Sequence, residues 1–259
     1  MRAVAVDWSG AKNPANKIWL AGADQGCLTR LEPMGSRDEA IDEVLGHLCR
    51  RKKAVAGLDF GFSLPAWFFR QNALSNVYGL WELAERDGEK WLNQCCRPFW
   101  GRPGKTKPDL ETHFRRTEEQ CRQMLGITPK SVFQIGGAGA VGTGSIRGMP
   151  FLRRIREHGV GIWPFDTCGL PLVVEIYPRI LTGPVVKRSG QSRADYLKTH
   201  WPDLPPKLAS HAIHSEDAFD AAVSALIMDA HFPEFENLPR VDDIARLEGE
   251  IWVPKRAGA

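Results

Sequence analysis

Four short segments of this chain each carry an acidic residue at or near their end. AVAVD ends at Asp7, AVAGLD at Asp59 and LVVE at Glu175, and SEDAFD contains Asp217 and Asp220. Short apolar runs without polar alternation are typical of strands covered on both faces. A carboxylate beside a buried sheet is costly unless positive charge lies nearby. The sequence therefore predicts an edge of a sheet where several carboxylates surround divalent cations.

The first 59 residues predict the order strand, strand, strand, helix, strand. Residues 3–7, 17–21 and 27–31 are separated by turn sequences and form a three-stranded meander. Ser36 and Glu39 have the form of a capping box, and the apolar residues that follow recur on one helical face. Residues 54–59 then predict a strand that pairs beside the first one after the helical crossover.

The pattern changes between residues 60 and 169, where aromatic, helical and glycine-rich segments follow one another. We interpret 60–169 as an insertion or cap within a single domain of residues 1–259. A strand at 172–177, a short helix at 192–199 and an amphipathic helix at about 215–230 complete the core. The predicted fold is α/β, with a mixed five-stranded sheet flanked by helices.

Composition limits the class of protein further. With 259 residues and 43% hydrophobic content, the chain can bury a substantial core. The sequence has no signal-peptide pattern and no uncharged stretch long enough to span a bilayer, which predicts a cytoplasmic protein without a membrane partner. Basic residues gather between Arg97 and Lys130, and acidic residues gather after Ala209. This distribution fits a nucleic acid partner and fits solvated helix faces equally well.

The acids are candidates for a two-metal site. Adjacent strands lie about 4.8 Å apart, so carboxylates at matching heights can share cations. We expect Asp7, Asp59, Asp217 and Asp220 to bind Mg²⁺ or Mn²⁺, with Glu175 as a further catalytic acid. Two such ions catalyse phosphoryl chemistry, because one lowers the pKa of an attacking water and the other stabilises charge on the leaving oxygen. Each acid taken alone is also explained by helix capping or by the end of a strand.

The meander, the helix and the strand with Asp7 and Asp59, followed by EIYP and SEDAFDAA, resemble the ribonuclease H-like superfamily. The whole pattern is similar to the predicted nuclease family known as domain of unknown function 429. The resemblance covers most of the chain, and the order of its short motifs is what makes it specific. It implies a ribonuclease H-like sheet and hydrolysis of phosphodiester bonds in DNA or RNA by a metal-activated water. It also implies that Asp7 is the central first-strand ligand, Asp59 the fourth-strand acid, and Asp217 with Asp220 the late helical acids.

Two loops are candidates for phosphate binding. Residues 137–142, GAGAVG, match the dinucleotide fingerprint GxGxxG, but no second half of a Rossmann sheet follows. We expect this loop, which follows a predicted strand at 131–135, to let phosphate approach the N-terminus of a helix, with Gly139, Gly142 and Arg147 as substrate contacts. A hinge or tight packing loop is the alternative.

The second loop, DWSGAK, resembles the phosphate loop of sugar kinases and actin-like ATPases and offers Ser9 and Lys12 to a phosphate. An ordinary surface turn explains it equally well. The leading hypothesis is a metal-dependent nuclease acting on DNA or RNA. The alternatives are a nucleotide-binding phosphotransferase or hydrolase on the same fold, and a non-catalytic nucleic-acid-binding module.

Overall fold

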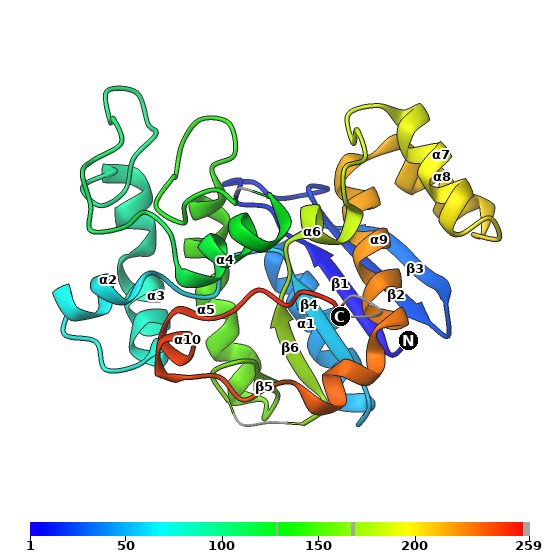
Figure 1. Cartoon of the computed structure of the whole chain (residues 1–259), viewed down its shortest axis with the longest axis horizontal. Coiled ribbons are helices and arrows are strands. Elements are labelled where there is room, and N and C mark those ends of the chain that lie inside the picture. The colour runs from blue at the N-terminus through cyan, green and yellow to red at the C-terminus, as the bar shows by residue number, and fades with distance from the viewer. Residues whose placement is uncertain (128, 167–168, 256–259) are drawn as a thin grey trace.

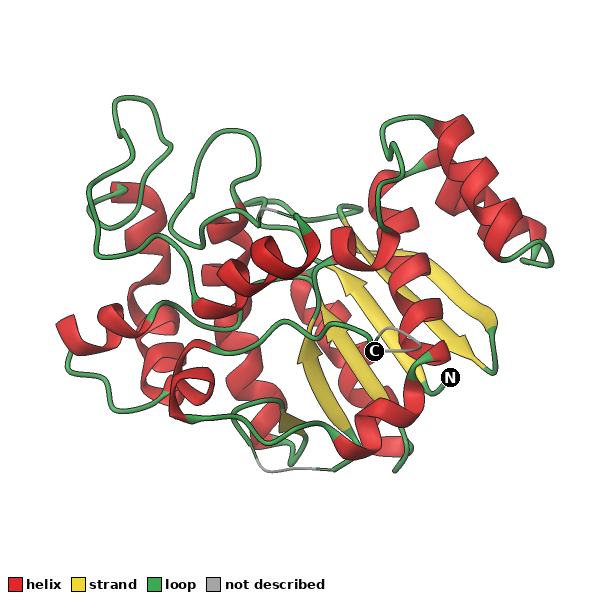
Figure 2. Cartoon of the chain, in the orientation of Figure 1, coloured by secondary structure: helices red, strands yellow, loops and turns green. Residues whose placement is uncertain are grey.

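The computed structural model describes residues 1–127, 129–166 and 169–255. A six-stranded sheet with the order β3-β2-β1-β4-β6-β5 runs through the molecule, and helices cover both of its faces (Figure 1, Figure 2). The first three strands pair antiparallel, and the other three add to β1 in parallel. The strands are β1 (Ala3–Asp7), β2 (Ile18–Asp24), β3 (Cys27–Met34), β4 (Val55–Leu58), β5 (Gly161–Ile162) and β6 (Leu172–Glu175).

This sheet confirms an α/β protein with a meander, a helix and parallel strands. The expected number of five strands is wrong, because β5 extends the sheet beyond β6. Its two residues are too few to show a periodic pattern, and its pairing partner β6 lies elsewhere in the sequence. The expected strand at 131–135 is also wrong, since this segment makes only an isolated bridge between Gln134 and Trp100.

Strand alternation divides the core into two layers. Val4, Val6 and Leu58 point to the layer that contains α1 (Arg37–Arg50) and α5 (Val141–Glu157). Ala5 and Val55 point to the opposite layer, where α9 (Glu216–Ala230) lies across the sheet (Figure 1). The face on which an acid at the end of a strand emerges is therefore fixed by its position in this alternation.

Local capping explains where the two predicted main helices begin. The Ser36 side chain accepts a hydrogen bond from the Glu39 N–H at the start of α1, and the Ser215 side chain accepts one from Ala218 at the start of α9. The short helix expected at 192–199 is α7 (Gly190–His200). An additional helix that was not predicted, α8 (Pro206–His214), begins at the second of two adjacent prolines and packs between α7 and α9.

The range 60–169 contributes to the core as well as to the periphery. It contains α2 (Ala66–Gln71), α3 (Val77–Gln94), α4 (Arg116–Leu125), α5 and β5. Ile146 and Met149 of α5 share a buried cluster with the strands β1 and β4. The part from α5 onward therefore builds the central layers, while the division into a domain and an insertion stays a prediction.

The C-terminal part returns to the sheet. After α6 (Pro178–Thr182), α7, α8 and α9, the chain forms a 3₁₀ helix (Phe232–Asn237) and α10 (Asp243–Glu248). The N–H of Trp252 then donates to the Glu175 carbonyl at 2.8 Å, and the indole is buried. Across the part of the chain that the structure describes, no helix has the length and apolar character needed to cross a membrane.

Candidate functional site

Asp7 and Asp59 lie side by side at the ends of neighbouring parallel strands. The Asp59 N–H donates to the carbonyl of Val6 at 3.0 Å, which sets the two residues at matching heights. Side chains an even number of positions apart along a strand point to the same face. Asp7 therefore points to the same face as Ala5, and Asp59 to the same face as Val55. Both of these apolar residues pack in the layer of α9. The two acids therefore emerge toward the N-terminal end of α9.

Helix α9 supplies the other two acids. Asp217 and Asp220 lie three residues apart in its first two turns, which places both near one face of the helix. Asp59, Asp220 and Asp217 all act electrostatically on Asp7. The structure thus brings together Asp7, Asp59, Asp217 and Asp220, which we call the acid cluster.

Lys187 is the cation that contacts the acid cluster. Its ammonium group forms an ion pair with Asp220 at 2.5 Å, and the two side chains are 21% and 13% exposed, respectively. The second carboxylate oxygen of Asp220, Oδ1, is buried and has no hydrogen-bond partner in the described ranges of the chain. Among the described residues, no hydrogen bond or ion pair engages the carboxylates of Asp7 and Asp59.

Burial and mutual repulsion disfavour ionisation of these acids. Burial raises the pKa of Asp7 well above its ordinary range, and the charges of Asp59, Asp220 and Asp217 raise it further. The pKa of Asp59 is raised well above its ordinary range, first by burial and then by Asp220. Burial also raises the pKa of Asp220, and Lys187 acts in the opposite direction. Additional positive charge at this place would therefore favour the ionised acids.

The residue types of the acid cluster fit a hard divalent cation, because Mg²⁺ and Mn²⁺ prefer carboxylate oxygens. Asp220 Oδ1, to which no described residue donates a hydrogen bond, is an acceptor for such an ion. Within the described ranges, no three His, Cys, Asp or Glu residues form a preassembled metal-binding group. Binding of a cation would therefore involve rotation of the acid side chains, and competition with Lys187 for Asp220.

Glu175 does not join the acid cluster. It is satisfied by Arg115, whose guanidinium donates to both carboxylate oxygens at 2.5 and 2.8 Å, and by the Phe62 N–H at 2.9 Å. Arg115 also pairs with Glu118 at 2.8 Å and donates to the carbonyl of Glu248. These fully buried contacts give Glu175 a structural role. A catalytic role for it stays untested.

The DWSGAK turn is held by its own contacts. The Ser9 hydroxyl accepts from the Ala11 N–H at 3.2 Å, and the Ser9 carbonyl accepts from Arg37. Lys12 is exposed. Arg147 forms an ion pair with Glu89 at 2.6 Å and is only 11% exposed, so its guanidinium fastens α5 to α3.

The glycine-rich loop packs closely against the neighbouring chain. A Cβ at Gly142 would lie 2.2 Å from the carbonyl oxygen of Val132, and the Gly142 N–H already donates to Gln134. Gly139 has a φ of +75°, a conformation that favours glycine. Tight packing therefore explains these glycines. Contact of a substrate with Gly139, Gly142, Arg147, Ser9 or Lys12 stays a prediction.

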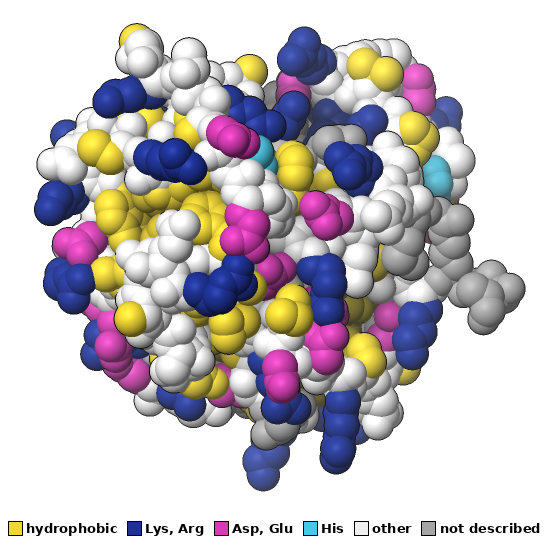
Figure 3. All heavy atoms as spheres, turned by 60° about the vertical axis from the view of Figure 1, so that its left-hand side comes forward, with side chains coloured by type: hydrophobic (Ala, Val, Ile, Leu, Met, Phe, Trp, Pro, Cys, Tyr) yellow, Lys and Arg dark blue, Asp and Glu magenta, His cyan; other side chains and the backbone are white. Residues whose placement is uncertain are grey.

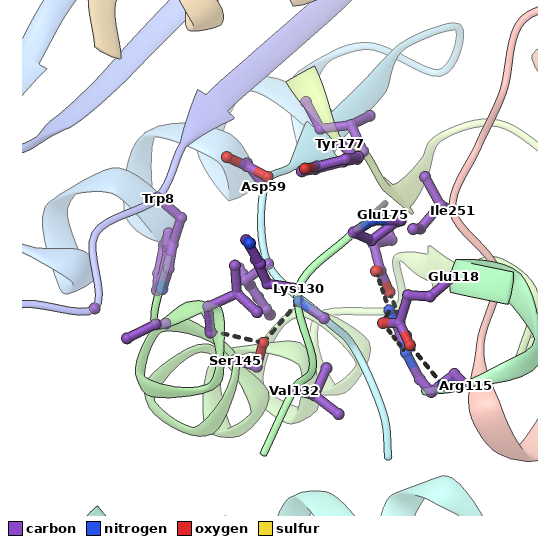
Figure 4. Close-up of a pocket in the computed structure, with 18 residues that line it drawn as sticks. Trp8, Asp59, Arg115, Glu118, Lys130, Val132, Ser145, Glu175, Tyr177 and Ile251 are labelled. Atoms are coloured by element: carbon purple, nitrogen blue, oxygen red, sulfur yellow. Dashed lines mark hydrogen bonds and ion pairs between the residues drawn. The ribbon is translucent and has the colours of Figure 1, made fainter. Parts of the chain in front are cut away.

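A cavity that the sequence analysis missed lies next to Asp59 (Figure 4). It has a volume of about 170 Å³, and its lining includes Trp8, Lys130, Val141 and Tyr177. Trp8 follows Asp7 directly, and Tyr177 comes two residues after Glu175. Aromatic residues just beyond the acidic ends of strands were the sequence signal that could have indicated this cavity.

Basic side chains are spread unevenly over the molecular surface. Lys and Arg predominate along the upper part of the view in Figure 3, whereas acidic and basic side chains are intermixed below. Arg102, Lys105 and Lys130 are exposed. Within the described residues they form no ion pair, unlike Arg153 and Arg154 of α5, which pair with acids. Part of the basic middle region is thus free to contact an anion.

Comparison with known proteins adds no assignment. No protein-family model matches the chain, and no curated protein or solved structure matches it either. The resemblance to ribonuclease H-like proteins therefore stays a prediction, and a functional conclusion depends on the geometry of the acid cluster and the adjacent cavity.

Proposed function

We propose that the protein is a Mg²⁺- or Mn²⁺-dependent nuclease with a ribonuclease H-like fold. The observation that carries this proposal is the acid cluster, in which the carboxylates of buried Asp7 and half-buried Asp59 lack partners within the described residues and a single lysine contacts Asp220. Such an excess of buried negative charge is costly in a protein without a cation. Perturbed acids gathered at one place are typical of functional sites.

The sheet supports the proposed family. An antiparallel meander is followed by α1 and then by β4, which pairs in parallel with the first strand. This is the order that the resemblance implies, and it puts Asp7 at the centre of the sheet with Asp59 on the next strand. The late acids also come from α9, the helix that crosses this part of the sheet.

Asp7 and Asp59 are the residues that we expect to hold the cations, with Asp220 and Asp217 completing the set. A bound Mg²⁺ or Mn²⁺ would lower the pKa of an attacking water and stabilise charge on the leaving oxygen of a phosphodiester. The strands fix the two central acids at matching heights, and the cap at Ser215 fixes the start of α9. Once Lys187 releases Asp220, its ammonium group can neutralise a nearby phosphate oxygen.

The proposal is tested by incubating purified protein with single- and double-stranded DNA and RNA in the presence of Mn²⁺ or Mg²⁺. We expect cleavage of at least one of these substrates. Asp7→Asn and Asp59→Asn should each reduce the rate by about 100-fold or more, because a lost ligand removes several kcal/mol of transition-state stabilisation. Products separated on a denaturing gel measure the rate.

Asp203→Asn is the matched control, since Asp203 is an exposed acid outside the cluster. It should leave cleavage unchanged. Cleavage that persists in both Asp7→Asn and Asp59→Asn, or that needs no divalent cation, would contradict the proposal. Turnover of ATP without cleavage of any polynucleotide would instead indicate a nucleotide phosphotransferase or hydrolase.

A further inference from the structure

The cavity beside Asp59 has mixed walls that suit a flat, partly polar group. Trp8, Val132 and Val141 form apolar parts of its lining, while Lys130 and Tyr177 add polar groups. Figure 4 shows the Lys130 side chain pointing into the space between Trp8 and Asp59. Cavities with mostly apolar walls and a few placed polar groups are typical of ligand sites.

Of the three carboxylates that line this cavity, Glu118 and Glu175 are neutralised by Arg115, and the third, Asp59, belongs to the acid cluster. These two glutamates and Arg115 form a closed ion-pair network in one part of the lining. Ser145 is likewise occupied, because its hydroxyl donates to the Val141 carbonyl and accepts from the Gly61 N–H. The groups left for a ligand are the rings of Trp8 and Tyr177 and the ammonium group of Lys130.

Trp8 carries a hydrogen-bond donor that is not used by any residue in the described part of the chain. The indole is 7% exposed and is fixed by Phe60 and Phe151, with ring centroids 4.9 and 5.7 Å away. Its Nε1 is buried and has no hydrogen-bond partner among the residues that the structure describes. A buried indole N–H usually finds an acceptor, so an acceptor atom of a ligand is a natural partner for it.

The size of the cavity limits what can enter. Pockets that hold a whole small-molecule ligand usually exceed about 300 Å³. A cavity of about 170 Å³ therefore admits one part of a larger ligand. Asp59 belongs both to the acid cluster and to the lining of this cavity, so a chain with a phosphodiester at the cluster has its neighbouring unit at the cavity.

We propose that this cavity binds one unpaired base of the nucleic acid strand that is cut at the acid cluster, with Lys130 contacting the adjacent phosphate. The inference rests on the proposed nuclease function and specifies its substrate as single-stranded or frayed nucleic acid. A base paired in a duplex cannot enter a cavity of one ring's size without leaving its partner. Stacking on Trp8 or Tyr177 tolerates any base, because each base has an aromatic face.

The test measures binding of fluorescent single-stranded oligonucleotides to the Asp7→Asn protein by anisotropy, with an abasic site placed at each position in turn. We expect one position at which loss of the base weakens binding about tenfold, the contribution of one stacked base. A fully paired duplex of the same sequence should bind more weakly. Val141→Phe, which fills the cavity, should make binding insensitive to the abasic site at that position.

Ala138→Phe is the matched control, because Ala138 is exposed in the same loop and does not line the cavity. Binding to this control variant should depend on the position of the abasic site in the same way as binding to the Asp7→Asn protein. Lys130→Ala should reduce the slope of log Kd against log salt concentration by about 0.7, the value for one phosphate contact on a single strand. Lys52→Ala should leave the slope unchanged, because Lys52 is exposed and precedes β4, at the opposite end of this strand from Asp59.

The outcomes separate this inference from the proposed function. An abasic scan without a sensitive position, or equal binding of duplex and single strand, overturns the base site even if Asp7-dependent cleavage is observed. Equal binding of a free nucleoside monophosphate and an oligonucleotide overturns it as well, since the cavity would then serve a mononucleotide. A sensitive position that Val141→Phe abolishes supports the base site, even if no cleavage is found and the nuclease proposal fails.

Discussion

At the residue scale, Asp7 combines a high cost for folding with the central place in the site. Its pKa is raised in the folded protein by burial and by the neighbouring acids, so the folded state binds protons more tightly than the unfolded state does. Stability therefore falls as the pH rises through the folded pKa. Asp7→Asn should raise the free energy of unfolding of the metal-free protein by about 1–3 kcal/mol at pH 7.5, the usual cost of an unsatisfied buried group.

Urea denaturation in EDTA at pH 5.5 and pH 7.5 measures this effect. The stability difference between Asp7→Asn and the unmodified protein should grow with pH, because only the unmodified protein ionises at this position. A variant that is less stable at both pH values would show that Asp7 has a stabilising partner. The same substitution should remove activity. A variant that is more stable but inactive would show that Asp7 is needed for function and not for stability.

Arg115 has the opposite character, since its buried charge is fully compensated by Glu118 and Glu175. Arg115→Met should destabilise the protein by about 3–5 kcal/mol, because both glutamates would be left buried without their cation. Arg153→Met is the control, as Arg153 pairs with acids while 45% exposed, and it should change stability far less than Arg115→Met does, because solvent screens exposed ion pairs. Equal effects of the two substitutions on the urea midpoint would contradict this account.

At the element scale, the segment between α6 and α7 brings Lys187 to the start of α9. Lys187→Met should lower the stability of the metal-free protein, since Asp220 loses its ion pair and the acid cluster loses its cation. A divalent cation no longer competes with the ammonium group in this variant. Added Mn²⁺ should therefore raise the melting temperature more in Lys187→Met than in the unmodified protein. Identical metal-induced shifts in a thermal scan would rule out competition at Asp220.

Elements with strong local signals were predictable, and those that depend on distant partners were not. The cap at Ser36 and the apolar stripe behind it indicated α1, and the runs ending at Asp7 and Asp59 indicated two adjacent strands. Residues 131–135 have strand-like composition but no strand to pair with over their length. Glu175 was grouped with the other acids because sequence patterns do not reveal Arg115, which lies 60 residues away.

Strand parity could have separated Glu175 from the other acids. Asp7 and Asp59 follow Val6 and Leu58, which point to the layer of α1 and α5, whereas Glu175 follows Val174, which belongs to the α9 layer. Glu175 must therefore point to the opposite face. The alternation was hidden in the sequence because strands buried on both faces carry no polar residues to mark the side.

At the scale of the whole molecule, the acid cluster joins segments that are far apart in the chain. Asp7 and Asp59 lie in the first quarter of the sequence. Asp220 lies on α9, in the last quarter of the sequence. A cation bound by all three would link β1, β4 and α9, so its binding free energy would add to global stability. A ligand at 100 times its dissociation constant stabilises the folded state by about 2.7 kcal/mol.

Thermal unfolding followed by circular dichroism at increasing Mn²⁺ concentration tests this coupling. We expect the melting temperature of the unmodified protein to rise by about 2–4 °C per kcal/mol of binding free energy, as for chains of this size. Asp7→Asn and Asp59→Asn should begin at a melting temperature equal to or above that of the unmodified protein and respond weakly to Mn²⁺. Asp203→Asn should respond like the unmodified protein, because its carboxylate is outside the cluster. If Mn²⁺ raised all four melting temperatures equally, the ion would be binding elsewhere, and the acids at the ends of β1 and β4 would need another explanation for their burial.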